Sequence, residues 1–199
     1  MKTPVVTGLI IAAGLSERMG SFKPLLDFEG EPFIVAITRK IINYCGKVII
    51  VTGYKSDEIN SIINSRFSSE NICLVYNPDY EKGMFTSLQK GINEALNSEW
   101  ILYHFVDQPF FAEQYYSEFI CQLNENSDWI QPSFNGKEGH PVLFNRKVSQ
   151  LIINSPPDSN LRIIKEDSAI TKTLWNCNYP EVLVDFDSKK NISDYYRNI

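Results

Sequence analysis

The sequence lacks the features of a membrane or secreted protein. None of its apolar runs approaches the ~20 uninterrupted apolar residues that a membrane-spanning helix needs, and the richest, Trp100–Val106, ends at Asp107. Thr7 and Gly8 interrupt the N-terminal apolar run, which has no charged region or cleavage site typical of a secretory signal. We therefore expect a cytoplasmic, soluble protein whose N-terminal run is a β-strand.

Metal-binding side chains and positive charge are also scarce. The chain has 4 cysteines without any Cys-x-x-Cys pair, and only 2 histidines, which argues against a zinc site and predicts reduced, mostly buried thiols. It has 19 Lys and Arg against 24 Asp and Glu, a net charge of −5. Because binding to a phosphate backbone depends on excess positive charge, nucleic acid is not an expected partner.

The chain does contain enough apolar material for one core. Its 199 residues are 43% apolar, which predicts a single domain spanning residues 1–199. Short apolar or aromatic runs, expected to be strands, are Val5–Ala12, Lys47–Thr52, Ile72–Tyr76, Trp100–Val106 and Trp129–Phe134. Segments of helical periodicity between them are Phe33–Tyr44, Asp57–Phe67, Phe85–Leu96 and Glu113–Leu123.

This alternation predicts an α/β fold with a mostly parallel, Rossmann-like sheet and helices on both faces. The alternation of expected strands and helices stops after Phe134, where a glycine-rich turn leads into short helical segments. A last strand is expected at Glu181–Phe186. The C-terminal half is therefore predicted to belong to the same domain and to contain a mixed sheet.

The loop after the first expected strand has the composition of a phosphate-binding loop. Ligands of open α/β sheets bind at the carboxyl ends of strands, where this loop begins. Ala12, Ala13 and Gly14 allow the backbone to approach a ligand closely, and Arg18 and Lys23 add positive charge. The spacing matches neither the P-loop nor the GxGxxG pattern. A solvated strand-to-helix turn fits the loop equally well on spacing alone.

A carboxylate follows the fourth expected strand. Asp107 lies at its carboxyl end, where it could bind Mg²⁺, which takes one or two carboxylates together with substrate phosphates. A second carboxylate could come from Asp185 or Asp187. The alternatives are a helix N-cap for Asp107 and a turn acid for Asp187, and the second of these is favoured when the residues are considered alone.

Two further segments fit a ligand site. Gly83 and Ser87 flank an expected helix start, where free amides favour an anionic or carbonyl-bearing ligand, although an ordinary capping loop explains them equally. His140 follows the glycine-rich turn and is placed to meet a substrate. His104 lies inside a strand, where a hydrogen-bonded core residue is expected.

Together these segments resemble the MobA-like nucleotidyltransferases, and among them the molybdenum cofactor cytidylyltransferase (MocA) group. The resemblance falls within residues 9 to 144 and is carried by Ile11–Gly20, Lys23–Leu26, Val51–Gly53, Asn77, Gly83–Met84, Ser87–Leu88, Asp107–Pro109 and Gly139–Phe144. It implies a fold like that of the nucleotide-diphospho-sugar transferases. It also implies Mg²⁺-dependent transfer of CMP from CTP to the phosphate of molybdopterin cofactor, with release of pyrophosphate.

The resemblance further implies roles for individual residues. The nucleotide-binding positions are Ala12, Ala13, Gly14, Ser16, Arg18, Lys23, Thr52, Gly53, Gly83 and Ser87. The catalytic positions are Arg18, Lys23 and Asp107, the metal ligands are Asp107 and Asp187, and the acceptor-binding positions are Gly139, His140 and Pro141. The Ala-Ala-Gly start of the first loop favours CTP over GTP. A transient contact with a molybdenum hydroxylase or its chaperone is implied as well.

Two C-terminal segments depart from the family pattern. Pro157–Arg162 stands where the family has Gly-Asp-x-Gly-Ala-Arg, and Asp185–Asn191 where it has Asp-Ile-Asp-Thr-Pro-Glu-Asp. A nucleotidyltransferase that uses GTP, or an acceptor such as a sugar phosphate or phospho-alcohol, is therefore an alternative. A non-catalytic protein that binds or delivers molybdenum cofactor is another, disfavoured because Arg18, Lys23 and Asp107 occur together.

Overall fold

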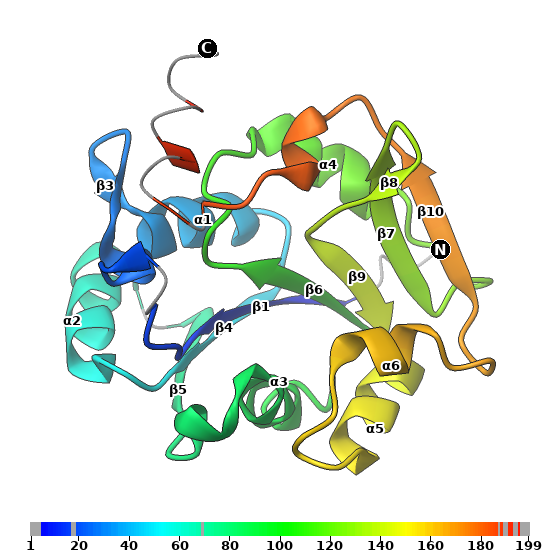
Figure 1. Ribbon diagram of the computed structural model, residues 1–199, viewed down its shortest axis with the longest axis horizontal. Helices are drawn as coiled ribbons and strands as arrows, with labels where there is room; N and C mark the ends of the chain where they lie inside the picture. Colours follow the sequence, from blue (N-terminus) through cyan, green and yellow to red (C-terminus); the bar gives the residue numbers. More distant parts are fainter. Residues whose placement is uncertain are drawn as a thin grey trace.

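Helices lie on both sides of a central β-sheet (Figure 1). The computed structural model describes residues 5–16, 19–68, 70–186, 188, 191–192 and 195. Among these residues, no helix combines the length and the apolar character needed to cross a membrane.

The main sheet contains β1 (Val6–Ala12), β4 (Lys47–Thr52), β5 (Ile72–Tyr76), β6 (Trp100–Phe105), β7 (Trp129–Phe134), β8 (Lys137–Glu138), β9 (Val142–Asn145) and β10 (Lys172–Asn176). A separate hairpin contains β2 (Asp27–Phe28) and β3 (Glu31–Pro32). The α-helices are α1 (Phe33–Ile41), α2 (Ser56–Arg66), α3 (Met84–Asn93), α4 (Glu113–Ile120), α5 (Arg146–Asn154) and α6 (Leu161–Lys165). Short 3-10 helices are η2 (Lys23–Leu25), η3 (Tyr80–Lys82) and η4 (Pro180–Leu183).

The strand order creates a switch point beside β1. The sheet runs β10-β7-β9-β6-β1-β4-β5, with β8 paired to β7. The chain passes from β1 to β4 and β5 on one side and then returns to place β6 on the other side, all four strands being parallel. Because the loops after β1 and β6 diverge at this point, their carboxyl ends leave a crevice of the kind that binds ligands in open α/β sheets.

Apolar side chains on both faces of the sheet explain why these segments form buried strands. Residues 48–51 of β4 are fully buried, as are the β1 residues Leu9 and Ile10. One face of the sheet packs against α1, α2 and α4, and the other against α3 and α5. The sheet is therefore covered on both sides and can hold the loops at its carboxyl edge in fixed positions.

The α/β fold, the five expected strands and the four expected helices are confirmed, with ends that shift by at most three residues. The expected strand at Glu181–Phe186 is wrong. Residues 180–183 form η4, which starts at a proline. Its Val182 carbonyl accepts a hydrogen bond from the backbone N–H of His140 at 3.0 Å. The expectation of mostly buried thiols holds for Cys45 and Cys177 but is wrong for Cys121, which is exposed.

Candidate active site

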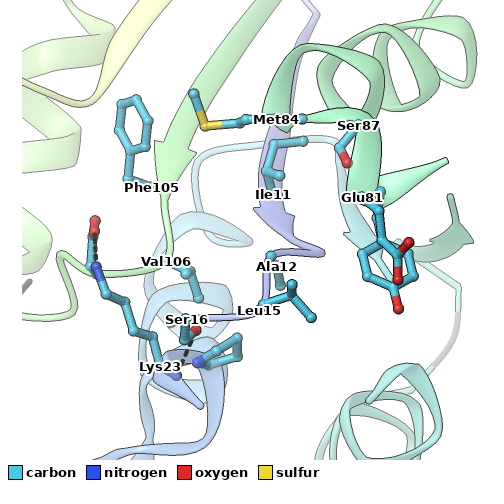
Figure 2. Close-up of a pocket in the computed structure, with 15 residues that line it drawn as sticks. Ile11, Ala12, Leu15, Ser16, Lys23, Glu81, Met84, Ser87, Phe105 and Val106 are labelled. Atoms are coloured by element: carbon cyan, nitrogen blue, oxygen red, sulfur yellow. Dashed lines mark hydrogen bonds and ion pairs between the residues drawn. The ribbon is translucent and has the colours of Figure 1, made fainter. Parts of the chain in front are cut away.

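A cavity of about 410 Å³ occupies the crevice between the ends of β1 and β6 (Figure 2). The first loop, η3, the start of α3 and the end of β6 enclose it. Its lining residues are Ile11, Ala12, Gly14, Leu15, Ser16, Lys23, Pro24, Tyr80, Glu81, Gly83, Met84, Ser87, Phe105, Val106 and Asp107. The structure therefore brings the first loop, Asp107 and the Gly83–Ser87 segment together around one space.

Lys23 and Asp107 form an ion pair in this cavity. The Lys23 ammonium lies 3.0 Å from Oδ2 of Asp107, and the two side chains are only 13% and 18% exposed. The first loop holds Lys23 in place, because the Ser16 hydroxyl accepts a hydrogen bond from the Lys23 backbone N–H at 3.1 Å. A cation thus lies at the junction of the two loops, where it can meet an anionic ligand.

The second carboxylate oxygen of Asp107 is suited to a cation. Oδ1 is buried and has no hydrogen-bond partner among the described residues. A buried anionic oxygen without a partner is costly unless a ligand satisfies it. The described residues contain no cluster of three or more metal-ligating side chains, so a cation here would take substrate oxygens and water among its ligands, as Mg²⁺ does.

The C-terminal segment fixes the Asp107 loop. The Phe186 N–H donates to the Asp107 carbonyl at 3.1 Å. The fully buried Gln108 side chain donates to the Val184 carbonyl at 2.9 Å and to Oδ1 of Asp185 at 3.0 Å. These bonds bring the C-terminal segment directly against the loop that carries Asp107.

The start of α3 forms the opposite end of the cavity. Gly83 precedes the helix with a backbone φ of +118°, which residues with a side chain rarely adopt. Among the described residues, no side chain caps the helix, so its first amides are open to a ligand or water. Met84 and Ser87 lie at this end of the cavity in Figure 2. An electronegative group of a ligand is therefore favoured at this end.

Three of the expected nucleotide-binding residues, Ala13, Thr52 and Gly53, are not among the residues that line the cavity. A Cβ at Gly53 would lie 2.6 Å from the Tyr80 side chain and 2.8 Å from the Ala13 carbonyl. The Thr52 carbonyl accepts from Asn77 N–H at 2.9 Å. These residues support the wall through close packing and backbone hydrogen bonds.

The segment from Gly139 to Pro141 lies beside the cavity. The His140 ring packs edge-on against Phe105, a lining residue, with ring centroids 4.4 Å apart. Burial lowers the pKa of His140 to about 4, so the ring is neutral near pH 7. Gly139 leaves no room for a side chain, since a Cβ would lie 2.3 Å from the Val182 carbonyl oxygen.

His104 is the hydrogen-bonded core residue that its strand position predicts. It is fully buried, its Nδ1–H donates to the Phe105 carbonyl, and its Nε2 accepts from the Tyr116 hydroxyl, each at 2.8 Å. Burial lowers the pKa of His104 to about 3. It therefore stays neutral and has a structural role.

Arg18 and Asp187 lie outside the described residues. Sequence reasoning assigned no role to Tyr80, Glu81, Met84 or Phe105, all of which line the cavity. Their position in the sequence could have identified them, because each lies at the carboxyl end of β5 or β6 or in the segment that follows it.

Residues 8–170 match the MobA-like NTP transferase domain. The chain belongs to this family. It is 30% identical over 155 residues to the molybdenum cofactor cytidylyltransferase of Escherichia coli (strain K12), covering 77% of each chain. It is 32% identical over 108 residues to the nicotine blue oxidoreductase of Paenarthrobacter nicotinovorans, covering 53% of this chain and 51% of that protein.

A solved structure with the same fold is a nucleotidyl transferase from Methanothermobacter thermautotroptrophicus. Its TM-score is 0.80 at 16% identity, and the match covers 98% of this chain and 97% of the other. The resemblance to the MobA-like family and the expected fold are thereby confirmed. This MobA-like chain is a nucleotidyltransferase, and its cavity lies at the edge of the sheet where the fold binds ligands.

Proposed function

We propose that this MobA-like chain transfers CMP from CTP to the phosphate of molybdopterin cofactor and releases pyrophosphate. The observation that carries the proposal is the Lys23–Asp107 pair, 3.0 Å apart inside the cavity between β1 and β6. The name of the Escherichia coli relative supports this reaction. The Ala12-Ala13-Gly14 sequence, which resembles the CTP-using group, favours CTP over GTP.

The cavity has two ends that suit the two ends of a nucleotide. Lys23 lies where the triphosphate of CTP would need positive charge, and the sequence places Arg18 in the same loop. Gly83 and Ser87 at the other end would face the base. The proposed orientation therefore directs the phosphates toward Asp107 and the cytosine toward α3.

The chemistry requires positioning and charge stabilisation more than proton transfer. A phosphate monoester has a second pKa near ~6 and is largely dianionic at neutral pH, so it needs no general base to act as the nucleophile. Its oxygen attacks the α-phosphorus of CTP in line with the bond to pyrophosphate, which breaks. Lys23 would stabilise the charge that develops on the phosphate oxygens, and so would Arg18.

The unpartnered Oδ1 of Asp107 fits a divalent cation, and we propose Mg²⁺ with Asp187 as a second carboxylate. When bound, the metal would neutralise charge on the triphosphate and the leaving pyrophosphate. Asp107 has the burial to hold it, and the ion pair with Lys23 orients this carboxylate.

The acceptor would approach from the side of Gly139, His140 and Pro141. His140 is neutral and held against Phe105, so it offers the pterin an uncharged polar ring beside the cavity. The family's Gly-Asp-x-Gly-Ala-Arg pattern is replaced here by Pro157–Arg162. A contact with a molybdenum hydroxylase or its chaperone would follow product formation.

The test is pyrophosphate release by the full chain with Mg²⁺ and molybdopterin cofactor, with CTP, GTP, ATP and UTP compared in parallel. Release with CTP alone supports the proposal. Release with GTP instead would assign the chain to guanylyl transfer, and release only with a sugar phosphate or phospho-alcohol would replace the acceptor. A folded chain that binds CTP but never releases pyrophosphate would be a carrier.

A further inference from the structure

Asn77 is buried directly behind the α3 end of the cavity. It is 3% exposed, and its backbone N–H donates to the Thr52 carbonyl at 2.9 Å. Its side-chain oxygen accepts from Asp79 N–H at 3.0 Å. Because a backbone N–H can only donate, this bond fixes which side of the amide carries the oxygen, and the NH₂ group must face the other way.

The NH₂ group of Asn77 faces two hydroxyls at the start of α3. It donates to Oγ1 of Thr86 at 3.1 Å and to Oγ of Ser87 at 2.9 Å. The Thr86 hydroxyl has carbonyl acceptors for its own proton, at Gly83 (2.9 Å) and Asp79 (3.1 Å). The donor and acceptor capacity of Thr86 is therefore used within the protein.

Ser87 differs from Thr86 in this respect. It accepts the hydrogen bond from Asn77, and no acceptor within the described part of the chain is in hydrogen-bond contact with its hydroxyl. The residue is 1% exposed and lines the cavity, and its oxygen lies at the cavity end of α3 in Figure 2. With one lone pair engaged by Asn77, the hydroxyl proton is available to a ligand in the cavity.

We infer that Asn77 is a positioning residue that holds the Ser87 hydroxyl as a hydrogen-bond donor to an acceptor atom on the nucleotide base. The inference rests on the proposed function, because it takes the base to lie at the α3 end. Cytosine fits this polarity, since N3 and O2 are acceptors on one edge. Asn77 acts through Ser87 and does not itself line the cavity.

The test is calorimetric titration of the full chain with CTP and Mg²⁺ in the absence of an acceptor. Ser87→Ala removes the donor and should weaken CTP binding about 5- to 10-fold, the effect of one hydrogen bond. Asn77→Leu keeps the side-chain size but frees the hydroxyl to rotate, and should cost a similar factor. Asn77→Asp keeps the acceptor for Asp79 N–H while removing the donor to Ser87, and serves if the Leu variant does not fold.

The decisive comparison is the double variant. In a Ser87→Ala background, the Asn77 substitutions should change CTP affinity less than about 2-fold, because the hydroxyl that they act on is gone. Gln89→Leu is the matched control: it removes an amide on the same helix whose NH₂ donates to the Ile152 and Ser155 carbonyls at 2.9 and 2.8 Å, and it should leave CTP affinity unchanged.

Two results would overturn the inference. One is Asn77 variants that bind CTP as tightly as the unchanged chain. The other is an Asn77 effect of the same factor whether residue 87 is Ser or Ala, which would mean that Asn77 acts through the surrounding backbone. If the unchanged chain binds no cytidine nucleotide, it is the proposed function that fails, and this outcome is visible before any variant is made.

Discussion

At the scale of single residues, the proposed nucleotidyl transfer depends most on the side chains of Lys23 and Asp107. Replacing either with Ala should reduce turnover about 10²- to 10³-fold, since removing one preorganised charged group at a developing charge typically has that effect. The fold should persist, because both side chains lie at a loop junction outside the core clusters. Steady-state pyrophosphate release, with circular dichroism to check folding, measures this.

Matched controls for these two variants are Lys90→Ala on α3 and Asp57→Ala on α2, both exposed positions away from the cavity. These should retain normal turnover. A Lys23→Ala or Asp107→Ala protein with near-normal turnover would remove these residues from the mechanism.

The sequence predicted the site residues that follow strand ends better than those that come from loop packing. Ala12, Lys23 and Asp107 could be placed together because parallel strands bring their carboxyl ends to one edge. Tyr80 and Phe105 also lie near strand ends, but position alone does not show that they line the cavity, because their orientation depends on tertiary contacts such as the packing of Tyr80 against Gly53.

At the scale of secondary-structure elements, η4 can pack closely against the turn before β9 because residue 139 is a glycine. Gly139→Ala would place a methyl group 2.3 Å from the Val182 carbonyl oxygen, so η4 must move. We expect a loss of about 2–4 kcal/mol in the free energy of unfolding, in the range of strained, overpacked sites. Chemical denaturation measures it. Gly46→Ala, where the nearest atom would be 4.0 Å away, is the control, and an equal effect of the two substitutions would contradict this packing argument.

The central strands were predictable because they are buried on both faces and read as continuous apolar runs, as in β4. The C-terminal elements were not. Pro180–Leu183 has strand-like residues, but its hydrogen bonds go to the turn at His140 and it forms η4. The edge strand β10 pairs with β7 and alternates between exposed and half-buried residues, so its sequence does not form the continuous apolar run that marks a buried strand.

At the scale of the whole molecule, two buried histidines make stability depend on pH. Burial lowers the pKa of His140 to about 4 and that of His104 to about 3, from an ordinary value of 6.5. In acid the unfolded chain therefore binds protons that the folded chain does not, so stability is fully present above pH 6.5 and is lost as the pH falls. Each histidine should lower the free energy of unfolding by about 2 kcal/mol between pH 7 and pH 5.

Urea unfolding at pH 7, 6 and 5 measures this dependence. His140→Gln should reduce the pH dependence of the free energy of unfolding by about 0.7 proton on average over this range, whatever its effect on stability at pH 7. A free energy of unfolding that is constant from pH 7 to pH 5 in the unchanged chain would show that the histidines are solvated in the folded state.

The central claim is that the cavity between β1 and β6 transfers a cytidylyl group. The most direct measurement follows two labels of CTP during incubation of the full chain with Mg²⁺ and molybdopterin cofactor. We expect label at the α-phosphate to appear in a pterin dinucleotide and label at the γ-phosphate to appear in pyrophosphate, and Lys23→Ala to slow both about 10²- to 10³-fold. An α-label that stays in CTP or in free CMP, from a folded protein supplied with intact cofactor, would contradict it.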